Sequence, residues 1–186
     1  MHSRHPVLAA LHGLMIFAQS IKVRRMIEGI ALDPKQTFWI LTMNLLGDSA
    51  SLEWSKVFGS WHEDTHWTRV VPKARHGEVR AALLVQLSFT QPEWKAYQNE
   101  IVAYRNEIVA HHDLKATVAK YPRYDKAIVA ANFMFDILRG IANPDQLGGI
   151  PTSLDRWSDT VAGNMSVIVR KAFEASATLG SNVPSD

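Results

Sequence analysis

The chain has 186 residues, of which 47% are hydrophobic and 20% are charged, and it contains no cysteine. This length and composition predict about one globular domain with a real core and exclude a collagen-like or largely disordered chain. The lack of cysteine excludes disulfides, cysteine-ligated metals and thiol nucleophiles. The formal net charge of +2 does not by itself indicate nucleic-acid binding, so any polyanion site must be a local patch.

The apolar stretch 7–18 near the start of the chain has to be compared with a signal peptide. It lacks the small-residue cleavage pattern, His12 interrupts it, and Arg24-Arg25 follow it. The longest other apolar run, 38–46, has about half the length that a membrane span requires. We therefore expect a cytoplasmic protein that does not associate with a membrane.

Apolar residues at helical spacing predict the first two helices. The first is predicted over 7–29, and Asp33-Pro34 predicts the N-cap of the second. The second helix is apolar almost all round over 38–46 and can continue to Phe58, as a helix through the middle of a domain would. Residues 59–72 are predicted as a loop or a short helix.

Two further helices are predicted in the middle of the chain. The first covers about 76–87. Its predicted inner side consists of Val79, Ala82, Leu83, Val85, Gln86 and Leu87. Thr90 and Glu93 form a capping-box pattern, so the next helix should start there and stop near His112. Its predicted apolar stripe consists of Trp94, Tyr97, Ile101, Tyr104 and Ile108.

The last third of the chain predicts a connector at 115–122, a helix over 127–142 and a loop at 143–151. Thr152 or Ser153 is predicted to cap a final helix. The inner stripe of that helix is predicted as Leu154, Trp157, Val161, Met165, Ile168 and Ala172.

No segment shows the two-residue alternation of a strand, and no long repeat is present. We therefore predict an all-α fold, a bundle of five to six helices. A single domain is expected over 1–180, followed by a frayed tail at 181–186.

Gly47-Asp48-Ser49 resembles the nucleophile block of Gly-Asp-Ser hydrolases, which need a strand-to-helix turn. Here the three residues interrupt an apolar helical run. A local cap or a solvated kink is therefore the favoured interpretation.

His62-Glu63-Asp64-Thr65-His66 matches the H-E-x-x-H pattern, which on a helix places two imidazoles on one face with a carboxylate beside a bound water. Asp64 and the flanking Trp61 and Trp67 do not fit a buried zinc helix, and no convincing third ligand follows. We expect the two tryptophans and the histidine pair to pack a loop against the core. A zinc-dependent hydrolase acting through His62 and His66 is an alternative function, less favoured than the two given below.

The segment from Tyr104 to Asp113 carries an Arg/His combination that suits phosphodiester chemistry. At 100° per residue, His112 lies about 20° and His111 about 120° from Arg105 on the helical wheel. A guanidinium binds phosphate through fixed donors, and a histidine at a helix end can transfer a proton near neutral pH. The structural alternative is that Arg105 pairs with Glu100, Glu107 or Asp113 and that the histidines cap carbonyls.

The block from Arg105-Asn106 to Ala110-His111 and Asp113 resembles the R-x4–6-H signature of the HEPN superfamily. Its amino-acid sequence is particularly similar to that of the abortive-infection AbiU-type branch. The stretches 54–59 and 65–67 are also similar to that branch, and the likeness covers roughly 35–115.

This resemblance implies a HEPN-like all-α bundle that forms a homodimer and joins two Arg/His motifs. It also implies a metal-independent endoribonuclease in phage defence or in a toxin–antitoxin pair, with RNA as substrate, no cofactor and an antitoxin as partner. Arg105 would hold the phosphate, Asn106 would orient it, and His111 would be the acid or base. The Ala-His-x-Asp pattern of the family favours His111 as the catalytic histidine, and the helical wheel favours His112.

Two sequence clusters could form a basic approach surface for RNA. They consist of Arg69, Lys73, Arg75 and Arg80, and of Lys115, Lys120, Arg123 and Lys126. Some HEPN proteins keep the fold without cleaving RNA. A non-catalytic helical binding or regulatory module is therefore the second alternative.

Overall fold

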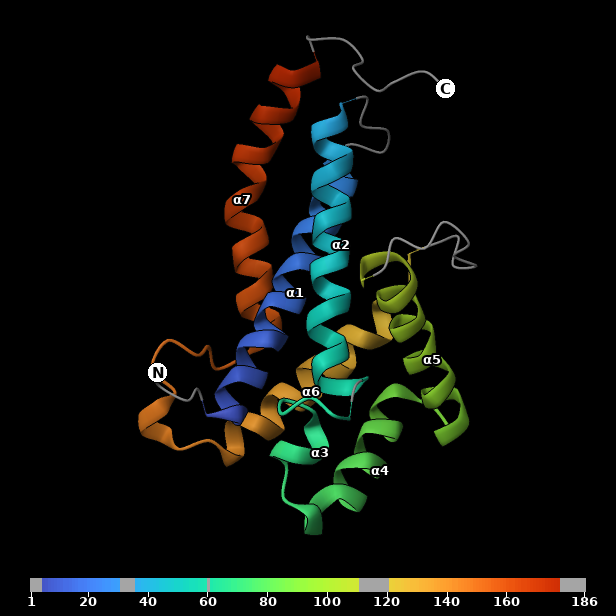
Figure 1. The fold of residues 1–186 in the computed structure, drawn as a ribbon. Helices are drawn as coiled ribbons and strands as arrows, with labels where there is room; N and C mark the ends of the chain where they lie inside the picture. The colour runs from blue at the N-terminus through green and yellow to red at the C-terminus, as the bar shows by residue number, and fades with distance from the viewer. Residues whose placement is uncertain (1–4, 31–35, 60, 111–120, 178–186) are drawn as a thin grey trace.

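The computed structural model describes residues 5–30, 36–59, 61–110 and 121–177 (Figure 1). Over these residues the protein is all-α and has no strand. The α-helices are α1 (Pro6–Ile30), α2 (Thr37–Phe58), α3 (Trp67–Val70), α4 (His76–Leu87), α5 (Gln91–Tyr104), α6 (Asp125–Ile141) and α7 (Leu154–Ala177). Short 3₁₀ turns cover Lys73–Arg75 and Pro144–Gln146, and Arg105–Ala110 is a π-helix that extends α5.

The prediction of an all-α fold is confirmed. The predicted count of five to six helices is too low, because the described residues contain seven α-helices. The additional one is α3, four residues long, in a segment that the sequence left open between loop and short helix. The six longer helices correspond to the six apolar segments of the sequence.

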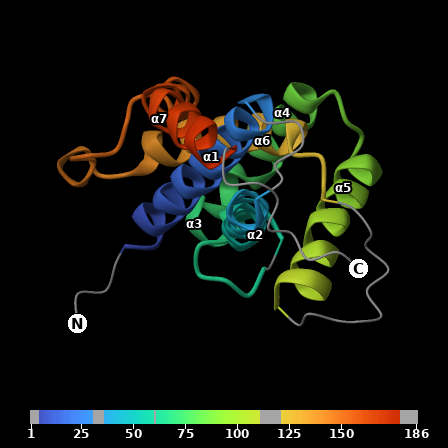
Figure 2. The ribbon, with the colours of Figure 1, turned by 90° about the horizontal axis from the view of Figure 1, so that it is seen from above.

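Helix α1 forms the centre of the bundle. It contacts α2, α7 and α6, and the views in Figures 1 and 2 show α2 and α7 on different sides of it. Such a helix must be apolar on several faces, which explains why it lacks a single apolar stripe. Among the described residues, α1 is also the one helix long and apolar enough to cross a membrane, and 56% of its most apolar window is buried inside the bundle.

The main core lies where α1, α2, α4, α5 and α6 meet. Its largest fully buried side chains include Phe17, Trp54, Phe58, Met134 and Phe135. Trp54 is in contact distance of three aromatic rings, with ring centroids 4.9 Å from Phe58, 5.8 Å from Trp94 and 6.2 Å from Tyr97. This aromatic cluster joins α2 to the N-terminal half of α5.

The predicted N-cap of the second helix is corrected. Asp33 and Pro34 lie outside the described residues, and α2 begins at Thr37 after Gln36. Gln36 has extended backbone angles, φ −104° and ψ 127°, and its side chain donates a hydrogen bond to the carbonyl of Ser176. Its carbonyl accepts hydrogen bonds from the N–H groups of Trp39 and Ile40, so Gln36 is the N-cap of α2.

Two predicted apolar stripes are only partly correct. In α4, Val79, Leu83 and Leu87 are buried, whereas Ala82, Val85 and Gln86 are exposed. In α7, Met165, Ile168 and Ala172 are exposed. The inner face of α7 instead follows Leu154, Ser158, Ala162, Val169 and Phe173. Apolar residues occupy two neighbouring stripes of α7, and a pattern of apolar positions alone does not show which stripe meets α1.

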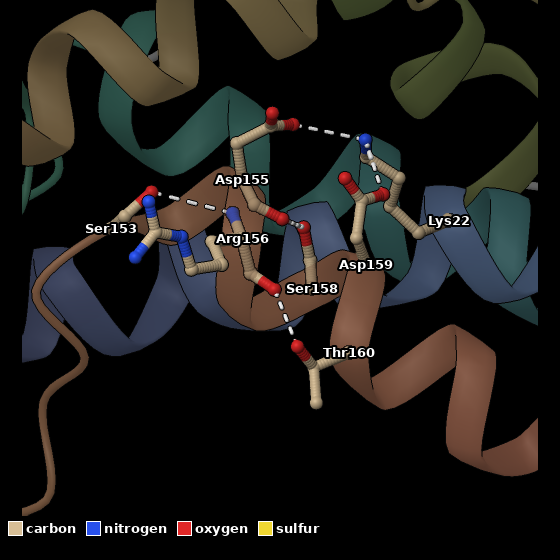
Figure 3. A network of polar contacts seen from close by, with 7 residues as sticks. All are labelled: Lys22, Ser153, Asp155, Arg156, Ser158, Asp159 and Thr160. Carbon is tan, nitrogen blue, oxygen red and sulfur yellow. Dashed lines mark hydrogen bonds and ion pairs between the residues drawn. The ribbon is translucent and has the colours of Figure 1, made fainter.

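A polar network accompanies the apolar contact between α1 and α7. Lys22 on α1 donates to Asp155 at 2.9 Å and to Asp159 at 2.7 Å, which lie one turn apart on α7 (Figure 3). The hydroxyl of Ser153 accepts a hydrogen bond from the backbone N–H of Arg156, which caps the start of the same helix. The two carboxylates therefore face α1 beside buried Ser158.

Candidate functional site

Arg105 and Asn106 lie at the start of the π-helix, directly after α5. The capping box of Thr90 and Glu93 that starts α5 is confirmed, and the buried side chains of Trp94, Ile101 and Tyr104 attach the helix to the core. The π-helix continues along α2, with which it is in contact.

The structure gives the two residues different environments. Arg105 is half-buried with its Nε shielded from solvent, and Asn106 is exposed. His111 and His112, the other two predicted site residues, lie outside the described residues. The structure therefore describes the surroundings of Arg105 and Asn106 in the motif.

The π-helical geometry changes the angle per residue with which the histidines are placed relative to Arg105. The placement of the histidines relative to Arg105 used 100° per residue, which holds for an α-helix. From Arg105 to Ala110 the hydrogen bonds run from i to i+5, so each turn contains more residues than in an α-helix. The choice between His111 and His112 from the helical wheel loses its basis.

A tyrosine next to Arg105 connects the π-helix to α2. The hydroxyl of Tyr104 donates a 2.7 Å hydrogen bond to Oδ1 of Asp48, and its ring centroid lies 5.1 Å from that of Tyr121. Burial, together with hydrogen bonds to Tyr121 and Asp48, raises the pKa of Tyr104. The hydroxyl therefore stays protonated and remains a donor at all physiological pH values.

Arg24 of α1 also contacts Tyr121. Its Cζ is 4.0 Å from the centroid of the Tyr121 ring, its Nε donates to Glu28 at 2.8 Å, and its Nη1 donates to the carbonyl of Met43 at 3.0 Å. A Cβ on Gly47 would clash with Arg24 Nη1 and lie 2.9 Å from Cε1 of Tyr121. The absence of a side chain at position 47 lets the guanidinium and the phenol lie against the backbone of α2.

These contacts correct the interpretation of Gly47-Asp48-Ser49. The three residues form neither a cap nor a solvated kink, because α2 is continuous from Thr37 to Phe58. Gly47 is a point of close approach, and Asp48 accepts the hydrogen bond of Tyr104. Both roles depend on partners far away in the sequence.

The H-E-x-x-H segment does not meet the premise of the zinc alternative. Residues 61–66 form turns, so the two imidazoles do not lie on one helical face. His62 is exposed and stacks on Trp61 with centroids 3.6 Å apart, whereas His66 is buried and caps α3 by accepting from the N–H of Thr68. Among the described residues, no group of three His, Asp or Glu side chains is arranged to hold a metal ion.

Basic residues are distributed differently from the expected approach surface. Arg69, Lys73, Arg75 and Arg80 lie on or beside α3 and α4, at the lower end of the molecule in Figure 1, whereas the π-helix follows the upper end of α5. Lys126 donates to the carbonyl of Leu87. Lys115 and Lys120 lie outside the described residues, and Arg123 lines a pocket together with Arg24 and Arg25.

Sequence reasoning missed Arg24, Asp48 and Tyr121 as residues of this region. A glycine in the middle of an apolar helix was the one local signal, because such a glycine often marks close packing. The identity of the approaching groups could not be read from it, since Arg24 and Tyr121 lie 23 residues before and 74 residues after Gly47.

The fold and these contacts define an all-α protein with an arginine at the start of a π-helical segment. Comparison with family models, with curated proteins and with solved structures finds no match for the chain. The function is therefore inferred from the residues of the site itself.

Proposed function

We propose that the protein is a HEPN-like, metal-independent endoribonuclease that acts in phage defence or in a toxin–antitoxin pair. The observation that carries the proposal is the local geometry at Arg105. The α-helix changes to a π-helix at the first residue of the Arg/His motif, and short π-helical segments occur frequently at functional sites.

Arg105 is suited to hold a phosphate because the elements around it are fixed. Tyr104 is 3% exposed and tied to Asp48, so the backbone of the next residue is held against α2. A positioned guanidinium can donate two parallel hydrogen bonds to the phosphate and stabilise the charge that develops on it. Asn106, exposed beside it, would orient the substrate.

The histidine of the motif would carry the proton. As general base it removes the proton of the RNA 2′-hydroxyl, whose oxygen then attacks the phosphorus. The bond from phosphorus to the 5′-oxygen breaks, the leaving oxygen takes up a proton, and the products are a 2′,3′-cyclic phosphate and a 5′-hydroxyl. This proposal needs no cofactor, and it places the protein in the cytoplasm as a homodimer that an antitoxin could control.

The test is RNA cleavage by the purified protein in the presence of a chelator. Structured and unstructured RNAs are incubated with the wild-type protein and with Arg105→Ala, His111→Ala and His112→Ala. We expect Arg105→Ala and one of the histidine variants to lower the cleavage rate by about 10²-fold or more. Comparison of the two histidine variants then identifies the acting residue.

The matched control is Arg170→Ala, which removes an exposed arginine of α7, on the other side of α1 and α2 from α5 (Figure 1). It should cleave at the wild-type rate, and the products should carry cyclic phosphate ends. Wild-type cleavage by Arg105→Ala, with circular dichroism showing an unchanged helical fold, would falsify the assignment.

A non-catalytic binding module is the second candidate, and one observation favours it. Phe38, Leu41 and Leu45 on α2 are 64%, 53% and 58% exposed, and apolar residues exposed together in this way mark interaction surfaces. If no RNA product forms in chelator and the protein still binds a partner through α2, the module is the better description.

A further inference from the structure

A polar pocket of about 270 Å³ lies between the second half of α1 and the residues that lead into α6. Three arginines line it, Arg24 and Arg25 from α1 and Arg123 from the other side, together with Tyr121. We propose that this pocket binds a phosphate group, which belongs either to an RNA strand or to a free phosphomonoester.

The guanidinium of Arg24 is positioned before any ligand arrives. Its side chain is 15% exposed, and it is held by Glu28, by the carbonyl of Met43 and by the ring of Tyr121. A donor that is already fixed loses little conformational entropy when it binds, so it contributes more to affinity than a mobile surface arginine. Gly47 makes this position possible because a Cβ there would clash with Arg24 Nη1.

Arg123 supplies a second donor from a different segment. Its side chain is exposed, and no carboxylate among the described residues forms an ion pair with it. Its backbone is fixed, because its carbonyl accepts a 2.6 Å hydrogen bond from the hydroxyl of Tyr97. The pocket thus has one deeply held guanidinium and one exposed guanidinium at its rim.

The charge balance of the pocket favours an anion. Two carboxylates, Glu28 and Asp125, also line it, so three arginines leave an excess of one positive charge. Arg25 pairs with Asp125 at 2.6 Å, but the two side chains are 44% and 73% exposed. An exposed pair of this kind contributes only about 0–1 kcal/mol, so a phosphate can compete for Arg25.

The pocket is connected to the proposed cleavage site through two rings. Tyr121 lines the pocket, packs against the guanidinium of Arg24 and contacts Tyr104, the residue before Arg105. An RNA strand held at Arg105 could place a neighbouring phosphate in this pocket. Binding of such an RNA phosphate rests on the proposed function. Binding of a free phosphomonoester does not depend on it.

The experiment measures binding of inorganic phosphate, of a nucleoside 5′-monophosphate and of a 2′-O-methylated RNA that the 2′-hydroxyl mechanism cannot cleave. The variants are Arg123→Gln, Arg25→Gln and Asp125→Asn, with Arg170→Gln, at an exposed position of α7 that does not line the pocket, as a charge-matched control. Arg24 is left unchanged because its substitution would also remove contacts between α1 and α2.

We expect Arg123→Gln and Arg25→Gln each to weaken phosphate binding about tenfold, which is the loss expected for one charged hydrogen bond. Asp125→Asn should tighten it, because a competing carboxylate disappears. The control should bind as the wild type does. Unchanged phosphate binding in both arginine variants, or weaker binding by Asp125→Asn, overturns the proposal.

The RNA arm separates the two sources of the phosphate. If Arg123→Gln weakens binding of the methylated RNA together with that of the free phosphates, the pocket holds a strand phosphate. If only the free phosphates are affected, the ligand is a phosphomonoester. If the wild-type protein binds phosphate through Arg123 but cleaves no RNA, the proposed function is contradicted and the phosphate-binding pocket is supported.

Discussion

The hydroxyl of Tyr104 donates a 2.7 Å hydrogen bond to Oδ1 of Asp48, and this bond ties the last residue of α5 to the middle of α2. Tyr104 is buried, and the π-helix with Arg105 begins at the next residue. The position of the arginine in the fold is therefore set by a contact between two helices and not by α5 alone.

Tyr104→Phe removes this hydrogen bond and keeps the ring. We expect the free energy of unfolding to fall by about 1–2 kcal/mol, because the half-buried carboxylate of Asp48 then lacks a donor. Asp48→Asn should cost less, since the amide oxygen can still accept. Urea denaturation measures both values, and equal stability of Tyr104→Phe and wild type would show that the bond contributes nothing.

Stability should also decrease in alkaline solution. Burial raises the pKa of Tyr124 to about 12, and burial is also the largest cause of the raised pKa of Tyr104. Above the ordinary tyrosine pKa of 10, the unfolded chain loses these protons while the folded protein keeps them, so deprotonation favours unfolding. We expect the unfolding free energy to fall from about pH 10 upward.

The matched test uses the variant Tyr104→Phe, which removes one of these titrating groups. Its unfolding free energy should fall less steeply above pH 10 than that of the wild-type protein. An identical slope would mean that Tyr104 titrates in the folded protein as it does in the unfolded chain.

The sequence predicts the helices well because each depends on local information. The capping box of Thr90 and Glu93 and the six apolar segments are properties of neighbouring residues, and all of them form helices in the structure. The choice of inner face is less local. Met165 and Ile168 are predicted inside and are exposed, because the stripe of Ala162, Val169 and Phe173 packs against α1 and α2 instead.

The sequence could predict only those residues of the candidate site that lie on one helix. The spacing of Arg105 and Asn106 from the histidines is visible in the sequence, and so is their place at the end of α5. The partners Asp48, Tyr121 and Arg24 come from other segments, and no periodicity indicates that they meet. The change from α- to π-helical geometry at Arg105 has no sequence signal either, so the helical wheel could not decide between the histidines.

His66 should make the protein less stable in mild acid. Burial lowers its pKa below 6.5, a backbone hydrogen bond to Phe58 opposes this, and the charge of Arg69 and the neighbouring His76 lower it further. As the pH falls below 6.5, the unfolded chain takes up a proton that the folded protein resists, so stability decreases.

His66→Asn provides the comparison, because asparagine also serves as an N-cap for α3. The unfolding free energy of the wild type should drop between pH 7 and pH 5 relative to that of the variant. Denaturation curves at several pH values measure the difference. Parallel pH profiles of the two proteins would contradict the lowered pKa.

Gly47→Ala is expected to be destabilising, although alanine has the higher helix propensity. The new Cβ would clash with Arg24 Nη1 and lie 2.9 Å from Tyr121 Cε1, and both groups are held by other contacts. We expect a loss of about 1–3 kcal/mol, typical of an overpacked position. Gly163→Ala on α7, where nothing lies within 4 Å, should be neutral or slightly stabilising in the same assay.

The contact of Lys22 with Asp155 and Asp159 should stabilise the attachment of α7 modestly. The lysine side chain is 21% exposed and the carboxylates 53% and 57%, so solvent screens the pair and each bond contributes about 0.2–1 kcal/mol (Figure 3). Lys22→Met, Asp159→Asn and the double variant form a cycle whose coupling energy isolates one bond.

We expect this coupling to be about 0.5 kcal/mol at low salt and to shrink in 1 M salt, where charges are screened within about 3 Å. Lys171→Met, at an exposed position of α7, serves as the control and should change stability by less than about 0.5 kcal/mol. A coupling energy of zero at low salt would mean that the apolar contacts of Val169 and Phe173 alone hold α7 against the bundle.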